Sequence, residues 1–197
     1  MTRAAEDAQL EVRSAPMWAD LITCANANTW TISKAGTSGA ANWAVDNTGI
    51  AAHTPDCSLN FNALNKTTSA YDTSCTAGAT SGNVAGFARS QVIALPALPA
   101  GAKALTLSYW YYVDAETISG YDVLRVSVKD GGNVNTTLAA QLPDKAAALK
   151  VWKQGTLDIT AQAGKKVVLE FSFDTVDCAN NSGTGVAIDS LMIRADK

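Results

Sequence analysis

The sequence predicts an all-β protein, built as a sandwich or barrel of short antiparallel strands. Short apolar or alternating runs repeat along the chain, and clusters of turn-forming residues separate them. Several runs alternate between apolar and polar side chains, as strands do when one face of a sheet packs on a core. Beyond the N-terminal segment, the only helical pattern is a short one at 144–150, which is also compatible with a turn.

The predicted elements follow in chain order. Residues 1–17 are polar and lack a clear apolar face, so we expect a flexible tail or linker there, and a single domain over 18–197. We expect about ten short strands. The candidate ranges are 18–24, 29–33, 42–46, 58–62, 86–95, 103–114, 121–129, 136–142, 151–159, 165–174 and 185–194. Residues 66–84 are mostly small and polar, which predicts a long surface loop.

The run 103–114 shows the alternation most clearly. One face carries five apolar or aromatic residues, Leu105, Leu107, Tyr109, Tyr111 and Val113. The opposite face carries Trp110 and Tyr112 among polar residues. The first face is therefore expected to line the core.

Composition excludes several functional classes. Lys and Arg number 15 and Asp and Glu number 18, so the net charge of -3 argues against a nucleic-acid partner. No apolar run approaches the roughly 20 residues that span a bilayer. The N-terminus lacks the apolar segment of a signal peptide, so we expect either an intracellular protein or a mature segment behind a new methionine. His53 is the only histidine, which excludes any mechanism that needs two.

The four cysteines favour the second of these alternatives. Each lies beside turn-forming polar residues, which favours disulfides and hence an oxidising compartment. Four cysteines allow three pairings, and we favour Cys57–Cys75 with Cys24–Cys178. The alternative is four free thiols in a cytosolic protein.

An ordered series of motifs gives a more specific indication. It comprises Trp30-Thr31-Ile32, Asn42-Trp43-Ala44-Val45, His53-Thr54-Pro55-Asp56, Leu105-Thr106-Leu107-Ser108-Tyr109-Trp110-Tyr111 and Val186-Ala187-Ile188-Asp189-Ser190-Leu191. The series resembles the jelly-roll modules of the MAM-like superfamily, which includes MAM domains, cleaved-adhesin domains and choice-of-anchor modules. Ala52 stands where MAM domains carry an acidic residue, and the cysteine placement also differs. The bacterial members are therefore the closer match.

The resemblance implies an antiparallel jelly-roll β-sandwich that is extracellular and non-catalytic. It also implies a structural calcium ion between Asp20 and Asp189, and loop oxygens such as those of Asp46 and Asn60 are further candidate ligands. Because Asp189 lies between apolar neighbours, its carboxylate needs a partner. The alternative to calcium is a hydrogen-bond donor.

The residues suggest a second kind of site. Exposed Trp110 and Tyr112 would form a platform for stacking on sugar rings, with Arg125, Ser108 and Glu170 as polar neighbours. The alternatives are that both faces of this strand are buried, and that Glu170 and Arg125 form a cross-strand ion pair. For His53, we expect a surface or structural role.

These observations lead to one principal function and one alternative. We expect a non-catalytic adhesion or accessory module of a secreted or cell-surface protein, possessing one calcium ion and no enzymatic activity. Its partner would be a protein or a surface glycan, and the module would belong to a larger polypeptide. The alternative is a carbohydrate-binding module that uses the aromatic platform.

Overall fold

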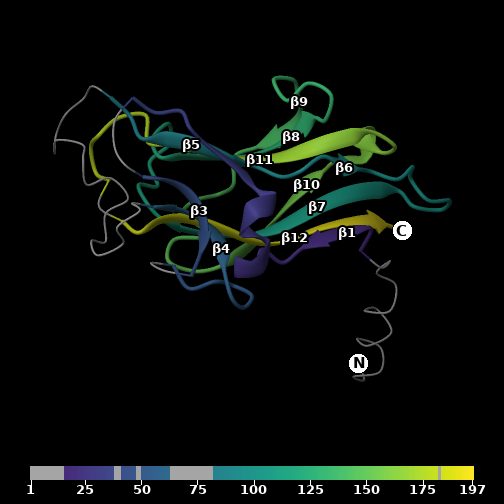
Figure 1. Ribbon diagram of the computed structural model, residues 1–197, viewed down its shortest axis with the longest axis horizontal. Coiled ribbons are helices and arrows are strands. Elements are labelled where there is room, and N and C mark those ends of the chain that lie inside the picture. The colour runs from purple at the N-terminus through teal and green to yellow at the C-terminus, as the bar shows by residue number, and fades with distance from the viewer. Residues whose placement is uncertain (1–15, 38–40, 48–49, 63–81, 182) are drawn as a thin grey trace.

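The computed structural model describes residues 16–37, 41–47, 50–62, 82–181 and 183–197, and these form two packed β-sheets (Figure 1). Every pairing between strands is antiparallel. None of the helical segments in these ranges is long and apolar enough to cross a membrane.

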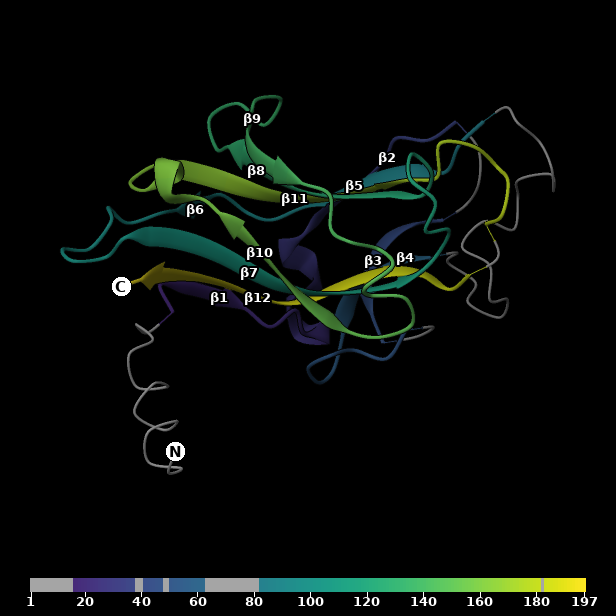
Figure 2. The ribbon, with the colours of Figure 1, turned by 180° about the vertical axis from the view of Figure 1, so that it is seen from behind.

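The first sheet has the strand order β10-β7-β12-β4-β3, with β1 also paired to β12. Its strands are β1 (Trp18–Asp20), β3 (Asn42–Asp46), β4 (Ser58–Asn62), β7 (Ala104–Asp114), β10 (Lys153–Asp158) and β12 (Gly185–Asp196). The second sheet has the order β2-β5-β11-β8-β9, with β6 also paired to β11. Its strands are β2 (Thr31–Lys34), β5 (Ala85–Arg89), β6 (Ile93–Ala94), β8 (Val123–Asp130), β9 (Thr137–Gln141) and β11 (Lys166–Asp174). Figure 2 shows the two sheets as separate layers.

The core lies between the layers and confirms the predicted sandwich. Every second residue of β7 from Leu105 to Val113 is buried, as the alternation predicts. Facing residues come from β8 and β11 of the other sheet, including Val126, Leu169 and Phe171, all fully buried. Packing of two inner apolar faces explains why alternating strands of this length are stable together.

A β-bulge interrupts the alternation in β12. Val186 and Ile188 point into the core before the bulge, whereas Leu191 and Ile193 do so after it. The register with β7 shifts between Asp189 and Met192, and Ser190 has a positive φ of 52°. A bulge inserts one extra residue and bends the strand. Because of this bulge, the residues of β12 that face outward near Trp110 follow a different alternation before and after Ser190.

Most predicted strands are confirmed within a few residues, and the differences are local. Strand 18–24 ends at Asp20, and a 3-10 helix η1 (Cys24–Thr29) follows it. The run 86–95 divides into β5 and β6. The 144–150 stretch forms turns rather than a helix, and a second short 3-10 helix, η2 (Thr160–Gln162), precedes β11.

The predicted cysteine pairing is wrong. Cys24 is bonded to Cys57, across a sequence separation of 33 residues. Cys178 is also disulfide-bonded, and Cys75 lies outside the described residues. The sequence reading placed Cys24 at the end of a strand over 18–24, whereas the strand ends at Asp20 and Cys24 begins η1. Disulfide formation itself is confirmed.

Candidate functional site

The segment 50–57 folds over the outer face of the first sheet, and we call it the covering loop. His53 stacks on Trp110 of β7, with ring centroids 3.9 Å apart and an interplanar angle of 17°. The indole N–H of Trp152 donates to the Ala51 carbonyl oxygen at 3.1 Å. At the far end of the loop, Cys57 is tied to Cys24. The loop is therefore fixed at three points.

Asp189 anchors the middle of the covering loop. Its side chain is fully buried. Its Oδ2 accepts the Thr54 backbone N–H at 2.8 Å, while Oδ1 accepts the Thr54 hydroxyl at 2.9 Å and the Ser190 N–H at 2.6 Å. Burial raises the pKa of the Asp189 carboxyl above its ordinary value, and these hydrogen bonds lower it only in part. Hydrogen-bond donors are thus the partner that the sequence required for this carboxylate.

Four aromatic rings are linked on this face, and we call them the aromatic cluster: His53, Trp110, Tyr112 and Trp152. Trp152 packs against His53 at 5.7 Å and against Tyr112 at 5.8 Å between centroids. As predicted, Trp110 and Tyr112 lie opposite the core face of β7. They are half-buried, because His53 and Trp152 cover part of them.

An outer-face groove of about 330 Å³ runs beside the aromatic cluster, across β10, β7 and β12. Trp110 and Met192 line it together with seven polar residues, namely Thr106, Ser108, Gln154, Thr156, Ser190, Arg194 and Asp196. These side chains offer both donors and acceptors. Gln154 is opposite Trp110 in the strand register, and Thr156 is opposite Ser108. Gln154 and Arg194 were not predicted as site residues.

His53 also contacts Ser190, with its Nδ1 3.1 Å from the Ser190 Oγ. A serine next to a histidine is part of the arrangement used in nucleophilic catalysis. A catalytic triad also needs an acid on the second ring nitrogen of the histidine. Among the described residues, no carboxylate takes that place, since the neighbouring Asp189 is bonded to Thr54 and Ser190. The contact is accounted for by the anchoring of the covering loop.

The structure separates Arg125 and Glu170 from the predicted platform. Arg125 lies on β8, in the other sheet, and is exposed. Glu170 lies on β11 and pairs with Arg89 at 2.6 Å and Lys129 at 3.2 Å rather than with Arg125. The alternation of each strand was read correctly, but alternation does not reveal to which sheet a strand belongs. Only Ser108 of the predicted polar neighbours lies beside Trp110.

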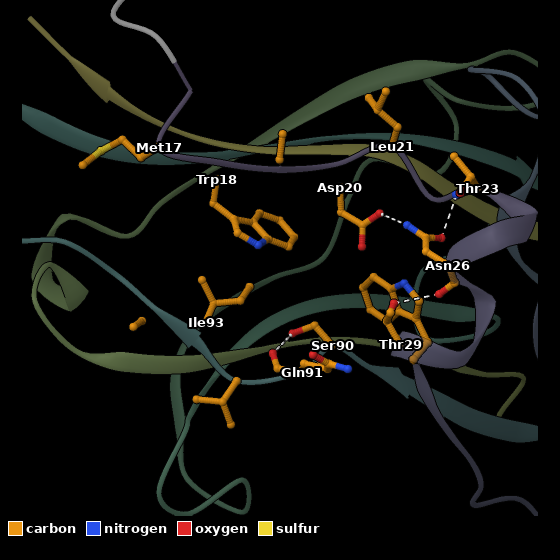
Figure 3. Close-up of a pocket in the computed structure, with 14 residues that line it drawn as sticks. Met17, Trp18, Asp20, Leu21, Thr23, Asn26, Thr29, Ser90, Gln91 and Ile93 are labelled. Atoms are coloured by element: carbon orange, nitrogen blue, oxygen red, sulfur yellow. Dashed lines mark hydrogen bonds between the residues drawn. The ribbon is translucent and has the colours of Figure 1, made fainter.

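A second hollow, of about 560 Å³, lies at the edge of the sandwich, where β1 of one sheet faces β6 of the other. We call it the edge pocket. Figure 3 shows Trp18 and Ile93 on opposite sides of it, with Asp20 and Asn26 at one end. Asn26 belongs to η1, which the Cys24–Cys57 disulfide holds in place. This pocket was not predicted from the sequence, because β1 and β6 are far apart in the chain.

Each predicted calcium ligand already has hydrogen-bond partners within the protein. Asp20 is opposite Leu191 in the register, near Asp189, but its Oδ1 accepts hydrogen bonds from Asn26 and Ile22. Asp46 accepts a hydrogen bond from the Asn60 amide at 3.0 Å. In the described part of the chain, the only three metal-ligand side chains with donor atoms within 4.8 Å of one another are Cys24, Asp56 and Cys57. Two of these form the disulfide, so calcium stays a prediction of the resemblance.

Comparisons with known proteins identify the fold. No family model matches the chain, and no curated protein has a significantly similar sequence. Among solved structures, the chain is similar to the carbohydrate-binding module TmCBM61 in complex with β-1,4-galactotriose, with a TM-score of 0.52 and 14% identity over 93% of this chain and 100% of that one.

Two further solved structures are similar over most of this chain. One is the enzymatically active domain of bacteriophage CBA120 tailspike protein 4, with a TM-score of 0.53 and 12% identity over 93% of this chain and 21% of that one. The other is the K3 cleaved adhesin domain of Lys-gingipain from Porphyromonas gingivalis, with a TM-score of 0.44 and 13% identity over 92% of this chain and 100% of that one.

At these identities, the likeness establishes the fold alone. The chain is a jelly-roll β-sandwich, as predicted. Membership of the MAM-like superfamily stays a prediction.

Proposed function

We propose that this protein is a carbohydrate-binding module and that the outer-face groove is its binding site. The observation that carries this proposal is the groove itself, where Trp110 lies among seven polar residues on a rigid sheet. A sugar presents apolar C–H faces and a rim of hydroxyl groups. An indole beside closely spaced donors and acceptors complements both features.

The strand framework supports binding without a large rearrangement. The polar residues project from three paired strands, and His53 stacked on Trp110 restricts the indole to one orientation. Side chains that are already ordered lose less conformational entropy on binding. The solved complex of TmCBM61 suggests β-1,4-galactotriose as the first oligosaccharide to test.

The proposal replaces the adhesion or accessory function as the leading one, because no separate feature of the described residues favours a protein partner. We propose an extracellular location, since the Cys24–Cys57 bond requires an oxidising compartment. Binding requires no catalysis, and we propose none.

The test is a calorimetric titration of the full chain with β-1,4-galactotriose and with gluco- and manno-oligosaccharides of equal length. We expect one of them to bind, and Trp110→Ala to weaken it at least tenfold, or by about 1.4 kcal/mol. Tyr121→Ala is the control, because Tyr121 is an exposed aromatic residue that precedes β8 of the other sheet. Equal losses in both variants, or undiminished binding by Trp110→Ala, would contradict the proposal.

A further inference from the structure

The edge pocket is separate from the outer-face groove. None of the residues that line one hollow lines the other. The pocket is bounded by β1, η1 and the segment from Ser90 to Ala94, whereas the groove lies across β7, β10 and β12. Its volume of about 560 Å³ falls within the range of small-molecule sites. Any function of the edge pocket therefore needs its own explanation.

A buried donor without a partner borders this pocket. Trp30 is 6% exposed, and its indole N–H has no hydrogen-bond acceptor in the part of the chain that the structure describes. A buried polar group left unpaired costs roughly 1–3 kcal/mol. Most such groups in folded proteins are paired, so the Trp30 N–H calls for an acceptor. The residue lines the pocket, but its nitrogen has almost no accessible surface, so an acceptor in the pocket reaches it only after a small shift of the Trp30 ring.

An acceptor without a donor lies at the same end of the pocket. Asp20 uses only Oδ1 for protein contacts, accepting the Asn26 amide at 2.7 Å and the Ile22 N–H at 2.8 Å. In Figure 3, the other carboxylate oxygen points away from Asn26 and toward the pocket. Gln91 adds an exposed amide from the opposite side. The pocket thus offers both acceptors and donors to a polar ligand.

Most of the remaining lining is apolar, with Thr23, Thr29 and Ser90 as further polar residues. Trp18 and Ile93 face each other across the hollow (Figure 3), and Met17 and Leu21 lie on the β1 side. Among the described residues, Asp20 is the only charged one that lines it. An anionic ligand would meet this carboxylate with no lysine or arginine in the lining to offset the repulsion. The lining therefore disfavours an anion, and its hydrogen-bonding groups beside apolar walls fit a neutral, polyhydroxylated ligand with an apolar face.

We propose that the edge pocket is a second binding site, which takes the terminal unit of a neutral sugar. Trp18 would contact the apolar face of the sugar ring. A ring or hydroxyl oxygen would accept the Trp30 N–H, and a hydroxyl group would donate to Oδ2 of Asp20. This proposal rests on the edge pocket and holds whether or not the outer-face groove binds sugar.

The test follows the five indole N–H resonances of the full chain by NMR during titration with D-galactose, D-glucose, D-mannose and β-1,4-galactotriose. Replacing each tryptophan by phenylalanine in turn assigns the resonances. We expect at least one probe to shift the Trp30 resonance in a saturable way at millimolar concentration. No shift of Trp30 or Trp18 with any of these sugars would overturn the proposal.

Two variants at the surface of the pocket keep the test independent of folding. Trp18→Ala should weaken the binding that Trp30 reports at least tenfold, and Tyr121→Ala, at an exposed residue outside both hollows, should leave it unchanged. D-galacturonic acid should bind more weakly than D-galactose to the unmodified chain, and Asp20→Asn should reduce that difference. Retained discrimination in Asp20→Asn, or equal binding by Trp18→Ala, would contradict the proposal.

The outcomes for the two sites are distinguishable. Shifts at Trp110 and Trp152 alone would support the groove and refute the edge pocket. Shifts at Trp18 and Trp30 alone would do the opposite. If no probe moves any indole resonance, both proposals fail.

Discussion

Asp189 shows how one buried carboxylate organises the outer face of the first sheet. The bulge at Ser190 turns the chain so that a backbone N–H reaches Oδ1, and Thr54 supplies the other two donors. In the covering loop, His53 stacks on Trp110, and its neighbour Thr54 covers the buried Asp189 carboxylate. The position of the loop beside the groove therefore depends on this side chain.

The raised pKa of Asp189 leads to a pH-dependent prediction. The folded-state pKa lies above the ordinary value of 3.8, so the native state takes up a proton at a higher pH than the unfolded chain. As the pH falls through the folded-state pKa toward 3.8, the free energy of unfolding of the unmodified chain should rise relative to that of Asp189→Asn. Urea unfolding at several pH values measures this difference.

Comparing the unmodified chain with Asp189→Asn at neutral pH tests the hydrogen bonds that the Asp189 carboxylate accepts. Asparagine places an NH₂ group where the carboxylate accepts, so it faces another donor. We expect Asp189→Asn to lower the free energy of unfolding by about 1–3 kcal/mol at pH 7. A difference between the two proteins that does not change with pH would show that the pKa of Asp189 is not raised.

At the scale of single residues, the sequence predicted that the Asp189 carboxylate needs a partner, but not which residue provides it. Its apolar neighbours Ile188 and Leu191 indicated burial and therefore a metal ion or a hydrogen-bond donor. Thr54 is 135 residues away in sequence, and only the folded sheet brings it near. Trp152 was missed as a site residue for a similar reason, since its contacts with His53 and Tyr112 join separate segments.

At the scale of elements, η1 and the covering loop form one unit held by the Cys24–Cys57 disulfide. Besides the covalent bond, the Cys24 N–H donates to Asp56 at 3.0 Å, and the Thr54 hydroxyl lies 3.1 Å from the Leu21 carbonyl oxygen. Asn26 of η1 lines the edge pocket, while His53 of the loop covers Trp110. The disulfide thus connects the surroundings of the two hollows.

Removal of this disulfide by the double variant Cys24→Ala/Cys57→Ala should lower the free energy of unfolding by about 2–4 kcal/mol. A cross-link over 33 residues restricts the unfolded chain, and values in this range are typical. Chemical denaturation without reductant measures the effect.

Because Cys178 is also disulfide-bonded, reductant is expected to destabilise the double variant further. A double variant as stable as the unmodified chain would show that η1 and the loop need no cross-link.

The bulge in β12 also shows why the sequence predicts some strands better than others. The bounds of β3 and β4 match the predicted runs 42–46 and 58–62, because regular alternation marks them. In β12, the inward residues change from even to odd numbers at the bulge. A pattern search with a period of two does not follow this change, so the outward position of Arg194 beside the groove was not foreseen.

At the scale of the whole molecule, alternation and turn signals were sufficient for the fold class but not for the arrangement of strands. They identified a sandwich and the core face of β7, β8 and β11. They did not distribute the strands between sheets, so Arg125 and Trp110 were placed together although they lie on opposite sheets. Sheet membership depends on long-range pairing, and the two hollows arise from that pairing.

A bound calcium ion would stabilise the whole molecule, so a thermal melt in calcium and in EDTA tests for the ion. An ion bound only to the native state at about 100 times its Kd stabilises by about 2.7 kcal/mol. For a chain of this size, that energy raises Tm by roughly 5–10 °C. Since protein donors already occupy both oxygens of Asp189 and one oxygen of Asp20, we expect EDTA to change Tm by no more than about 2 °C.

A fall in Tm of several degrees in EDTA that calcium restores, and magnesium does not, would contradict this expectation and support the ion that the resemblance implies. Asp20→Asn would then locate it, because the loss of one ligand charge should remove the calcium effect if Asp20 binds the ion. If the calcium effect persisted in Asp20→Asn, the ion would lie elsewhere, and the free Oδ2 would remain available to a ligand in the edge pocket.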